Sequence, residues 1–415
     1  MSNSILIVGG GFSGITTALE AAEVGYETYI VEKNPYLGGR VAQLNQYFPK
    51  LCPPSCGLEI QFQRIRKSKV RYYTMAEVVS VSGTKGNYDV TVKIKPRYVN
   101  ENCTACGECA NVCETMVESE FDFGMGMHKA AYLTHPFAFP MRYVIDKERC
   151  SQEELQKMAE VCKYDAIDLE EEERTIELNV GSIVWATGWK PYDVTKLTTL
   201  GSGKVPNVIS NMQMERLAAP NGPTGGKILR PFDGQAPKKV AFVQCAGSRD
   251  RNHLDYCSYI CCMASLKQAM YVREQYPDAK VTIFYIDLRT PGKYEKFLNK
   301  VEADEKVSFV KGKVAEVNEG KSGEVLVTYE DAMAGTKQAD SFDMVVLATG
   351  MEPSVCGQDL PVEMVQDANC FLEDNSGAGI YAAGCAKNPL DVMTSAESAT
   401  GAALKSIQTL VGGKE

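Results

Sequence analysis

The sequence predicts an α/β protein with two Rossmann-like domains and a cysteine-rich domain inserted into the first. Three observations carry this prediction. A glycine-rich turn follows an apolar strand at residues 4–8, two later strands end in Ala-Thr-Gly at residues 186–188 and 348–350, and four cysteines lie close together in residues 103–113. The chain has 415 residues, which suggests two or three domains because a single core rarely grows that large.

Composition and charge narrow the range of functions. Hydrophobic residues make up 44% of the chain, which is sufficient for real cores, and the net charge is −9. A protein that binds a phosphate backbone would carry a basic excess, so we expect no nucleic-acid partner. The sequence has no apolar run of membrane-spanning length and no signal-peptide pattern at residues 1–4. We therefore expect a cytoplasmic protein, linked to a membrane only through partner subunits.

The N-terminal segment has the pattern of a dinucleotide site. Gly9, Gly11 and Gly14 form G-x-G-x-x-G between the strand at residues 4–8 and a helical run at residues 15–22. These glycines allow a tight turn, close approach of a pyrophosphate and close helix–strand packing. The pyrophosphate would sit at the helix N-terminus. Glu32, at the end of the next strand, would bind the adenosine ribose hydroxyls.

Further segments favour FAD over NAD at this site. Gly38-Gly39-Arg40 closely follows Glu32, and with the two Ala-Thr-Gly strands this pattern resembles flavoproteins of the thioredoxin reductase type. Residues 380–385 resemble the segment that closes such flavin sites, although Cys385 stands where that class usually has an acid. The residues predicted to bind FAD are Gly9, Gly11, Phe12, Ser13, Gly14, Glu32, Lys33, Gly39, Arg40, Ala186, Thr187, Gly188, Gly350, Gly384 and Cys385.

The cysteine run at residues 103–113 predicts a ferredoxin-like insert. Its spacing, C-x2-C-x2-C-x3-C, is typical of bacterial ferredoxins, in which the fourth cysteine of each run serves the other cluster. Only Cys150 and Cys162 remain of a second run, so we expect one cluster. Its predicted ligands are Cys103, Cys106, Cys109 and Cys162, with Cys113 as the alternative fourth ligand. Cys113 and Cys150 would then be relics of the lost cluster.

Two other cysteine groups are less regular. Cys245, Cys257, Cys261 and Cys262 follow a strand at residues 239–244, where a Rossmann domain would have its phosphate loop. Their spacing leaves an iron–sulfur site, a zinc site and buried thiols open. Cys52 and Cys56 follow the Gly-Gly-Arg turn; unpaired thiols are favoured there over a redox disulfide. Cys356 and Cys370 have no recognisable spacing.

Taken together, the motifs resemble the flavoprotein A subunit of heterodisulfide reductase over nearly the whole chain. The resemblance is carried by residues 9–14, 103–113, 121–126, 143–146, 244–250, 256–263 and 284–290. It implies that Cys245, Cys257, Cys261 and Cys262 bind an unusual 4Fe–4S cluster close to FAD. With the insert, we therefore expect FAD and two 4Fe–4S clusters.

Within that family, the chain length and the end of the sequence soon after residue 405 most resemble the A subunit of the quinone-interacting membrane-bound oxidoreductase complex. The resemblance implies an electron-transfer subunit that links the menaquinone pool to adenylylsulfate reductase in dissimilatory sulfate reduction. The implied partners are a second flavoprotein of the same family and a membrane haem/quinone subunit. The chain would lie peripherally on the inner face of the membrane.

The expected domains follow from these motifs. Residues 1–97, 169–235 and 345–415 form the FAD domain, residues 98–168 the insert, and residues 236–344 the second Rossmann-like domain. Lys267 could stabilise reduced flavin, the alternative being an ordinary lysine on a helix surface. Two other functions stay open: a stand-alone NAD(P)H-dependent disulfide reductase, which would need a phosphate loop in the second domain, and an electron-bifurcating subunit of the heterodisulfide reductase type.

Overall fold

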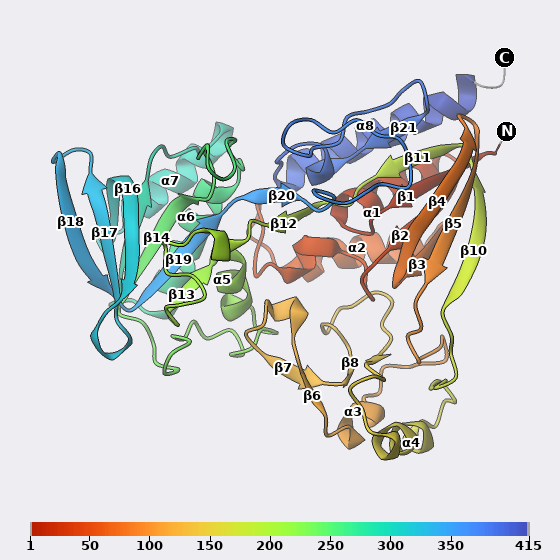
Figure 1. Ribbon diagram of the computed structural model, residues 1–415, viewed down its shortest axis with the longest axis horizontal. Coiled ribbons are helices and arrows are strands. Elements are labelled where there is room, and N and C mark those ends of the chain that lie inside the picture. Colours follow the sequence, from red (N-terminus) through yellow and green to blue (C-terminus); the bar gives the residue numbers. More distant parts are fainter. Residues whose placement is uncertain (1, 413–415) are drawn as a thin grey trace. The chain divides into compact units, whose positions relative to one another are not determined.

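The computed structural model describes residues 2–412, which form two compact units (Figure 1). Unit 1 contains the described residues of Met1–Trp189 and Pro353–Glu415, and unit 2 is Lys190–Glu352. The chain passes between the units at strands β12 (Trp189–Pro191) and β20 (Met351–Pro353). Among the described residues, no helix is long and apolar enough to cross a membrane.

Unit 1 is built on a five-stranded parallel sheet. The strands lie in the order β21-β11-β1-β2-β3, with bounds Ile380–Ala382, Ser182–Trp185, Ser4–Val8, Glu27–Glu32 and Val70–Thr74. The expected strands at residues 4–8 and 27–31 are confirmed. Because successive side chains of a strand point to opposite faces, β1, which is buried along its whole length, has cover on both faces of the sheet.

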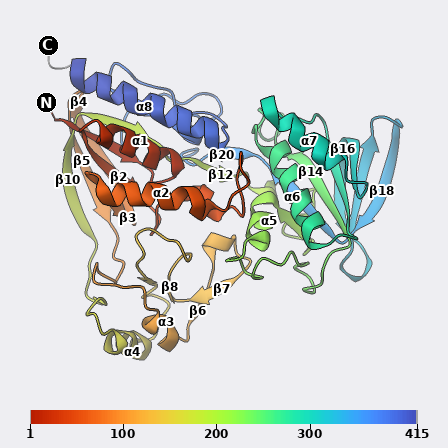
Figure 2. The same cartoon turned by 180° about the vertical axis from the view of Figure 1, so that it is seen from behind.

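Helices cover one face and a second sheet covers the other. The helices are α1 (Phe12–Glu23), α2 (Pro54–Lys67) and α8 (Val392–Gly412), which lie together in Figure 2. Ile5 and Ile7 pack in the same core as Leu19 of α1 and Leu410 of α8. On the other face, Leu6 and Val8 join the core of an antiparallel sheet ordered β10-β5-β4, with bounds Arg174–Val180, Asn87–Ile94 and Ala76–Thr84.

Within unit 1, the insert begins after β5 and ends before β10. These two strands are antiparallel neighbours, with Ile94 opposite Arg174, so the two ends of the insert lie side by side. The insert contains β6 (Met116–Glu118) paired with β7 (Met127–Lys129), β8 (Ala131–Tyr132) paired with β9 (Val144–Ile145), and helices α3 (Glu108–Val112) and α4 (Gln152–Val161). Its small core includes the buried residues Val99, Leu155 and Met158.

Unit 2 is built on a seven-stranded sheet in the order β13-β19-β14-β15-β16-β17-β18. Its strands are Val208–Ser210, Met344–Thr349, Lys239–Ala246, Lys280–Tyr285, Val307–Glu319, Val325–Asp331 and Thr336–Phe342, and its helices are α5 (Asn211–Ala218), α6 (Cys261–Gln275) and α7 (Glu295–Glu302). The first five strands are parallel and the last two are antiparallel. Short 3-10 turns across both units are Gly39–Gln43, Glu120–Asp122, Val194–Lys196, Gly292–Tyr294, Lys321–Gly323 and Gly384–Ala386.

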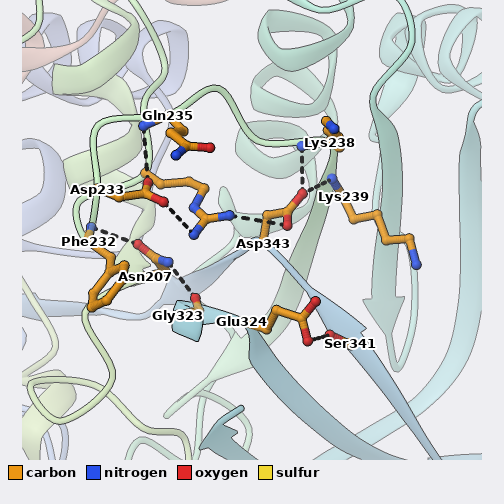
Figure 3. Close-up of polar contacts among 11 residues, drawn as sticks. Asn207, Phe232, Asp233, Gln235, Lys238, Lys239, Gly323, Glu324, Ser341 and Asp343 are labelled. Atoms are coloured by element: carbon orange, nitrogen blue, oxygen red, sulfur yellow. Dashed lines mark hydrogen bonds and ion pairs between the residues drawn. The ribbon is translucent and has the colours of Figure 1, made fainter. Parts of the chain in front are cut away.

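Unit 2 begins at Lys190, whereas the second domain was expected to begin at residue 236. One reason is that β13 pairs with β19, which makes both strands part of this sheet. Polar contacts also fix the segment before β14 to unit 2 (Figure 3). Asn207 accepts a hydrogen bond from the N–H of Phe232 at 2.9 Å and donates one to the carbonyl of Gly323 at 2.7 Å, and Asp343 accepts from the backbone N–H groups of Lys238 and Lys239 at 2.7 and 2.8 Å.

Candidate functional site

The glycine-rich turn of unit 1 is packed so closely that only glycine fits at two of its positions. Gly9 has φ +109°, and a Cβ atom there would collide with the carbonyl of Ala186. A Cβ atom on Gly14 would collide with the carbonyl oxygen of Gly9. Gly11 differs, because a Cβ atom there would meet only the Cα of Gly39, at 3.8 Å. The space above Gly11 is therefore open, as close approach of a pyrophosphate requires.

Glu32 is buried at the end of β2, and its carboxylate is hydrogen-bonded to the glycine-rich turn. Its Oε2 accepts a hydrogen bond from the N–H of Gly10 at 2.6 Å, and its Oε1 accepts from the backbone and side chain of Asn34 at 2.8 and 2.7 Å. Burial raises the pKa of the Glu32 carboxyl, and the hydrogen bonds from Asn34 and Gly10 oppose that rise. The carboxyl group thus orders the turn, and its contact with a ribose stays a prediction.

Segments far apart in the sequence converge on this turn. Gly384, with φ +62°, abuts the hydroxyl of Ser13 at the start of α1, and its N–H donates to Ser398 of α8 at 3.0 Å. The thiol of the adjacent Cys385 is buried and donates to the carbonyl of Leu390 at 3.4 Å. Thr187 supplies a buried hydroxyl with no hydrogen-bond partner among the described residues. An unpaired buried hydroxyl and an open glycine turn fit a polar, phosphate-bearing cofactor such as FAD.

Three other residues predicted to bind FAD have different surroundings. Arg40 donates to the carbonyl of Trp189 at 3.2 Å, and its guanidinium lies 5.5 Å from the ring centre of Phe123 in the insert. Lys33 is exposed. Gly350 lies in unit 2, directly after β19, where a Cβ atom would collide with the hydroxyl of Ser248. The second Ala-Thr-Gly strand therefore belongs to the sheet of unit 2, and not to that of the expected FAD domain.

Three thiols of the insert lie around a tight loop before α3. Ala105 and Gly107 adopt left-handed conformations, with φ +57° and +87°, and the N–H of Ala105 donates to Cys103 Sγ at 3.4 Å. Burial, with the neighbouring Cys103 and Cys106, raises the pKa of the Cys109 thiol to about 11. A bound cation would reverse this tendency and favour thiolates.

Cys162 and Cys113 occupy different surroundings in the insert. Cys162, at the end of α4, accepts a hydrogen bond from the N–H of Ala166 at 3.4 Å; the carbonyl of Ala166 accepts from Asn100, just before Cys103. Cys113 is buried and hydrogen-bonded to the thiol of Cys150. Cys113 and Cys150 thus form a hydrogen-bonded pair, and Cys162 as the fourth ligand stays a prediction.

In unit 2, four thiols lie together at the carboxyl end of the parallel sheet. Cys245 follows Gln244 of β14 with φ +56°, Cys257 lies in the next loop, and Cys261 and Cys262 begin α6. Burial raises the pKa values of the Cys245, Cys261 and Cys262 thiols, and in each case the charges of neighbouring cysteines raise them further. The N–H of Tyr259 donates to Cys257 Sγ at 3.4 Å. The four predicted cysteines thus lie near enough to interact electrostatically with one another.

Cationic side chains stand beside these thiols, and the motifs of the sequence predicted no role for them. The guanidinium of Arg249 is hydrogen-bonded to the Cys245 thiol and lies 2.8 Å from the carboxylate of Asp287. Arg289 donates its backbone N–H to Cys262, and its charge opposes the rise in that thiol's pKa. Both arginines could have been noticed only as charges close in sequence to the cysteine motif and to the end of β15.

Lys267 is buried in α6, so the alternative of an ordinary surface lysine is wrong. Its ammonium lies 3.1 Å from the carboxylate of Glu215 in α5, and both side chains are almost fully enclosed within unit 2. Its proposed role at the flavin stays a prediction.

The remaining cysteines are either free thiols or joined in a disulfide. Cys52 and Cys56 are free. Cys356 and Cys370 form a disulfide in unit 1. Within residues 2–412, no group of three or more His, Cys, Asp or Glu side chains is arranged at metal-binding distances, so both clusters stay predictions.

Known proteins resemble the chain over its whole length. It is 37% identical to the A subunit of the H(2):CoB-CoM heterodisulfide,ferredoxin reductase of Methanothermobacter thermautotrophicus, covering 100% of this chain and 65% of that protein. It is 39% identical to an iron-sulfur A subunit of the CoB-CoM heterodisulfide reductase of Methanopyrus kandleri, with the same coverage. The chain is a relative of the heterodisulfide reductase A subunits.

These relatives are longer than this chain, which spans about 65% of their length. The family resemblance expected from the motifs is confirmed. Residues 4–120 also match the model of the FAD dependent oxidoreductase family, which covers the glycine-rich turn and Glu32. This match supports a FAD-type nucleotide domain at the start of the chain.

Solved structures agree with the expected fold class. Thioredoxin reductase from T. acidophilum matches with a TM-score of 0.55 and 14% identity, covering 100% of this chain and 99% of that one. Bacillithiol disulfide reductase from Staphylococcus aureus matches with a TM-score of 0.53 and 13% identity, covering 100% of both chains. At these identities the similarity establishes the fold alone. The prediction of two Rossmann-type domains in a thioredoxin reductase-like α/β protein is confirmed.

Proposed function

We propose that this relative of the heterodisulfide reductase A subunits is the FAD- and iron–sulfur-carrying electron-transfer subunit of a multi-subunit redox complex. One observation carries the proposal: Cys245, Cys257, Cys261 and Cys262 gather at the carboxyl end of β14, where a dinucleotide-binding domain presents its phosphate loop. Ligands of open α/β sheets bind at this edge. A set of thiols there supports a cluster in the place of a nicotinamide nucleotide.

Unit 1 would hold the flavin through its own backbone and side chains. The N–H groups at the start of α1 face the open position above Gly11 and would bind the pyrophosphate. Glu32 keeps the turn in shape through Gly10, and Thr187 has a free hydroxyl for a further contact. FAD, when bound, supplies the exchange between two-electron and one-electron transfer.

The thiols of the insert and of unit 2 would hold one 4Fe–4S cluster each. The ligands would be Cys103, Cys106, Cys109 and Cys162 in the insert, and Cys245, Cys257, Cys261 and Cys262 in unit 2. Backbone N–H groups of Ala105, Ala166 and Tyr259 donate to three of these sulfurs. Hydrogen bonds to cluster sulfurs tune the reduction potential, so the chain fixes part of each potential through its backbone.

We place the complex between the menaquinone pool and adenylylsulfate reductase, on the cytoplasmic face of the membrane. A second flavoprotein of the family and a membrane haem/quinone subunit would be its partners. This assignment rests on the resemblance of the motifs. The names of the relatives favour a second candidate, an electron-bifurcating subunit of the heterodisulfide reductase type. Reconstitution with either set of partners, followed by flavin reduction from menaquinol or from reduced ferredoxin, separates the two.

A stand-alone NAD(P)H-dependent reductase is the third possibility, and the turn after β14 argues against it. Gly247 is packed against the ring of Tyr192, at 2.7 Å from an added Cβ atom, and α6 begins only at Cys261. A phosphate loop needs an open turn that leads directly into a helix. NADH and NADPH should therefore not reduce the flavin of the purified holoprotein at a useful rate. Rapid stoichiometric bleaching by either nucleotide would contradict the proposed function.

A further inference from the structure

Cys356 and Cys370 form the one disulfide among residues 2–412, while the other thirteen cysteines are free. They are 14 positions apart and match no motif of the proposed function. Eight of those thirteen are the proposed cluster ligands, whereas Cys356 and Cys370 are bonded to each other. In reducing compartments such pairs are usually catalytic or redox-sensing.

The disulfide lies on two segments fixed to the predicted flavin site. Two residues before Cys356, the N–H of Ser354 donates to the carbonyl of Gly188 at 3.0 Å. Two residues after Cys370, the N–H of Leu372 donates to the carbonyl of Ala386 at 2.9 Å. Two residues span at most about 7 Å. Each cysteine is therefore held close to a segment predicted to contact FAD, the Ala-Thr-Gly strand end or the turn after Gly384.

The neighbouring residues make the position of the disulfide rigid. Val355 and Leu372 are buried in the core that contains Val8 of β1, directly before the glycine-rich turn. Cys370 adopts φ +67°, and its N–H donates to the carbonyl of Asp367 at 3.0 Å. A non-glycine residue in the left-handed region is strained, and such strain persists where the surroundings enforce it, often at functional sites.

Both cysteines are half-buried, so their sulfurs are neither sealed in the core nor fully exposed. Half-exposed disulfides are more easily reduced than enclosed structural ones. A purely structural link would need no attachment to the flavin segments. Its contribution would be limited to closing a short loop, which stabilises a fold by restricting the unfolded chain.

We propose that Cys356–Cys370 is a redox-active disulfide that exchanges two electrons with the flavin of unit 1. The inference rests on the proposed function, since FAD in its two-electron reduced form is the donor. On reduction, the sulfur–sulfur bond breaks and the pair takes up two electrons and two protons, giving two thiols. The flavin returns to its oxidised form. The reverse step returns both electrons and releases both protons.

Anaerobic reductive titration of the full holoprotein tests this proposal. Free thiols are first blocked with iodoacetamide, the flavin is reduced by light without any added thiol, and newly exposed thiols receive a second, heavier alkylating label. Peptides with Cys356 and Cys370 should carry the second label, and electron uptake should exceed that of the Cys356→Ser/Cys370→Ser double variant by two electrons per chain. Cys56→Ser is the matched control, because Cys56 is an exposed free thiol of the same unit.

The possible results separate this inference from the proposed function. A purified protein that holds no flavin would contradict both. A protein whose flavin is fully reduced while Cys356 and Cys370 stay disulfide-bonded would contradict only the inference. So would electron uptake that is equal in the double variant, even if the variant melts at a lower temperature, because that result describes a structural link. Single variants add a check: in Cys356→Ser, Cys370 should accept the first label without any reduction.

Discussion

The guanidinium of Arg249 lies 2.8 Å from the carboxylate of Asp287 and joins the loops that follow β14 and β15. Arg249 is also hydrogen-bonded to the Cys245 thiol, and the thiol of Cys262 donates to the carbonyl of Asp287 at 3.5 Å. The ion pair thus fixes a positive charge beside the predicted cluster. A cation there favours the more negative, reduced state of a cluster.

Removing this charge should lower the reduction potential of the cluster in unit 2. A hydrogen bond to a charged group contributes about 1.5–3 kcal/mol, and 1.4 kcal/mol corresponds to about 60 mV for one electron. We expect Arg249→Leu to lower the potential by about 60 mV in a titration followed by paramagnetic resonance. Arg251→Leu, at an exposed position two residues away, should leave it unchanged. An equal shift in both variants would mean that the contact with Cys245 has no special role.

A substitution at Gly11 should impair flavin binding without impairing folding. A Cβ atom there meets no described atom closer than 3.8 Å, and φ is −73°, which any residue adopts. Gly11→Val should therefore fold but lose FAD, since the side chain fills the pyrophosphate position. Absorbance at the flavin band measures binding, and circular dichroism measures the fold. Gly401→Ala, at an open position on α8, should keep FAD. Full flavin content in Gly11→Val would place the nucleotide elsewhere.

Sequence patterns correctly predicted the features that depend on residues close together in the chain. The turn at residues 9–14, the cysteine run of the insert and the strand before Cys245 each depend on adjacent residues. The missed features depend on partners far apart in the chain. Lys267 is buried because Glu215 neutralises it from another helix, and the Cys356–Cys370 pair forms because separate backbone contacts hold its two segments. The start of unit 2 was misplaced because β13 is short and its pairing with β19 leaves no local pattern.

The insert offers a test of which thiols are ligands. Cys150 is hydrogen-bonded to Cys113, and burial, with the neighbouring Cys113 and Glu154, raises the pKa of its thiol to about 12. Cys162 instead accepts a hydrogen bond from the N–H of Ala166. Cys162→Ser should therefore lose the cluster of the insert, about four iron atoms per chain, while Cys150→Ser should keep it. Iron and sulfide analysis of the two variants measures this directly. The opposite pattern would make Cys150 the ligand and Cys162 the relic.

Variants of the four cysteines in unit 2 test whether this unit holds a cluster that exchanges electrons with the flavin. Cys261 and Cys262 occupy the first turn of α6, a helix of 15 residues, where the helix dipole opposes the burial that raises the pKa values of both thiols. Cys257 is held by the N–H of Tyr259, and Cys245 by Arg249. Replacing one ligand leaves three, so Cys257→Ser and Cys262→Ser should each remove about four iron atoms. FAD should stay, because the residues predicted to bind its pyrophosphate lie in unit 1. Electron exchange between the flavin and partner subunits should then slow at least tenfold.

Unchanged iron content together with an unchanged paramagnetic resonance spectrum in both variants would show that these thiols hold no cluster. The electron route proposed through unit 2 would then be wrong as well.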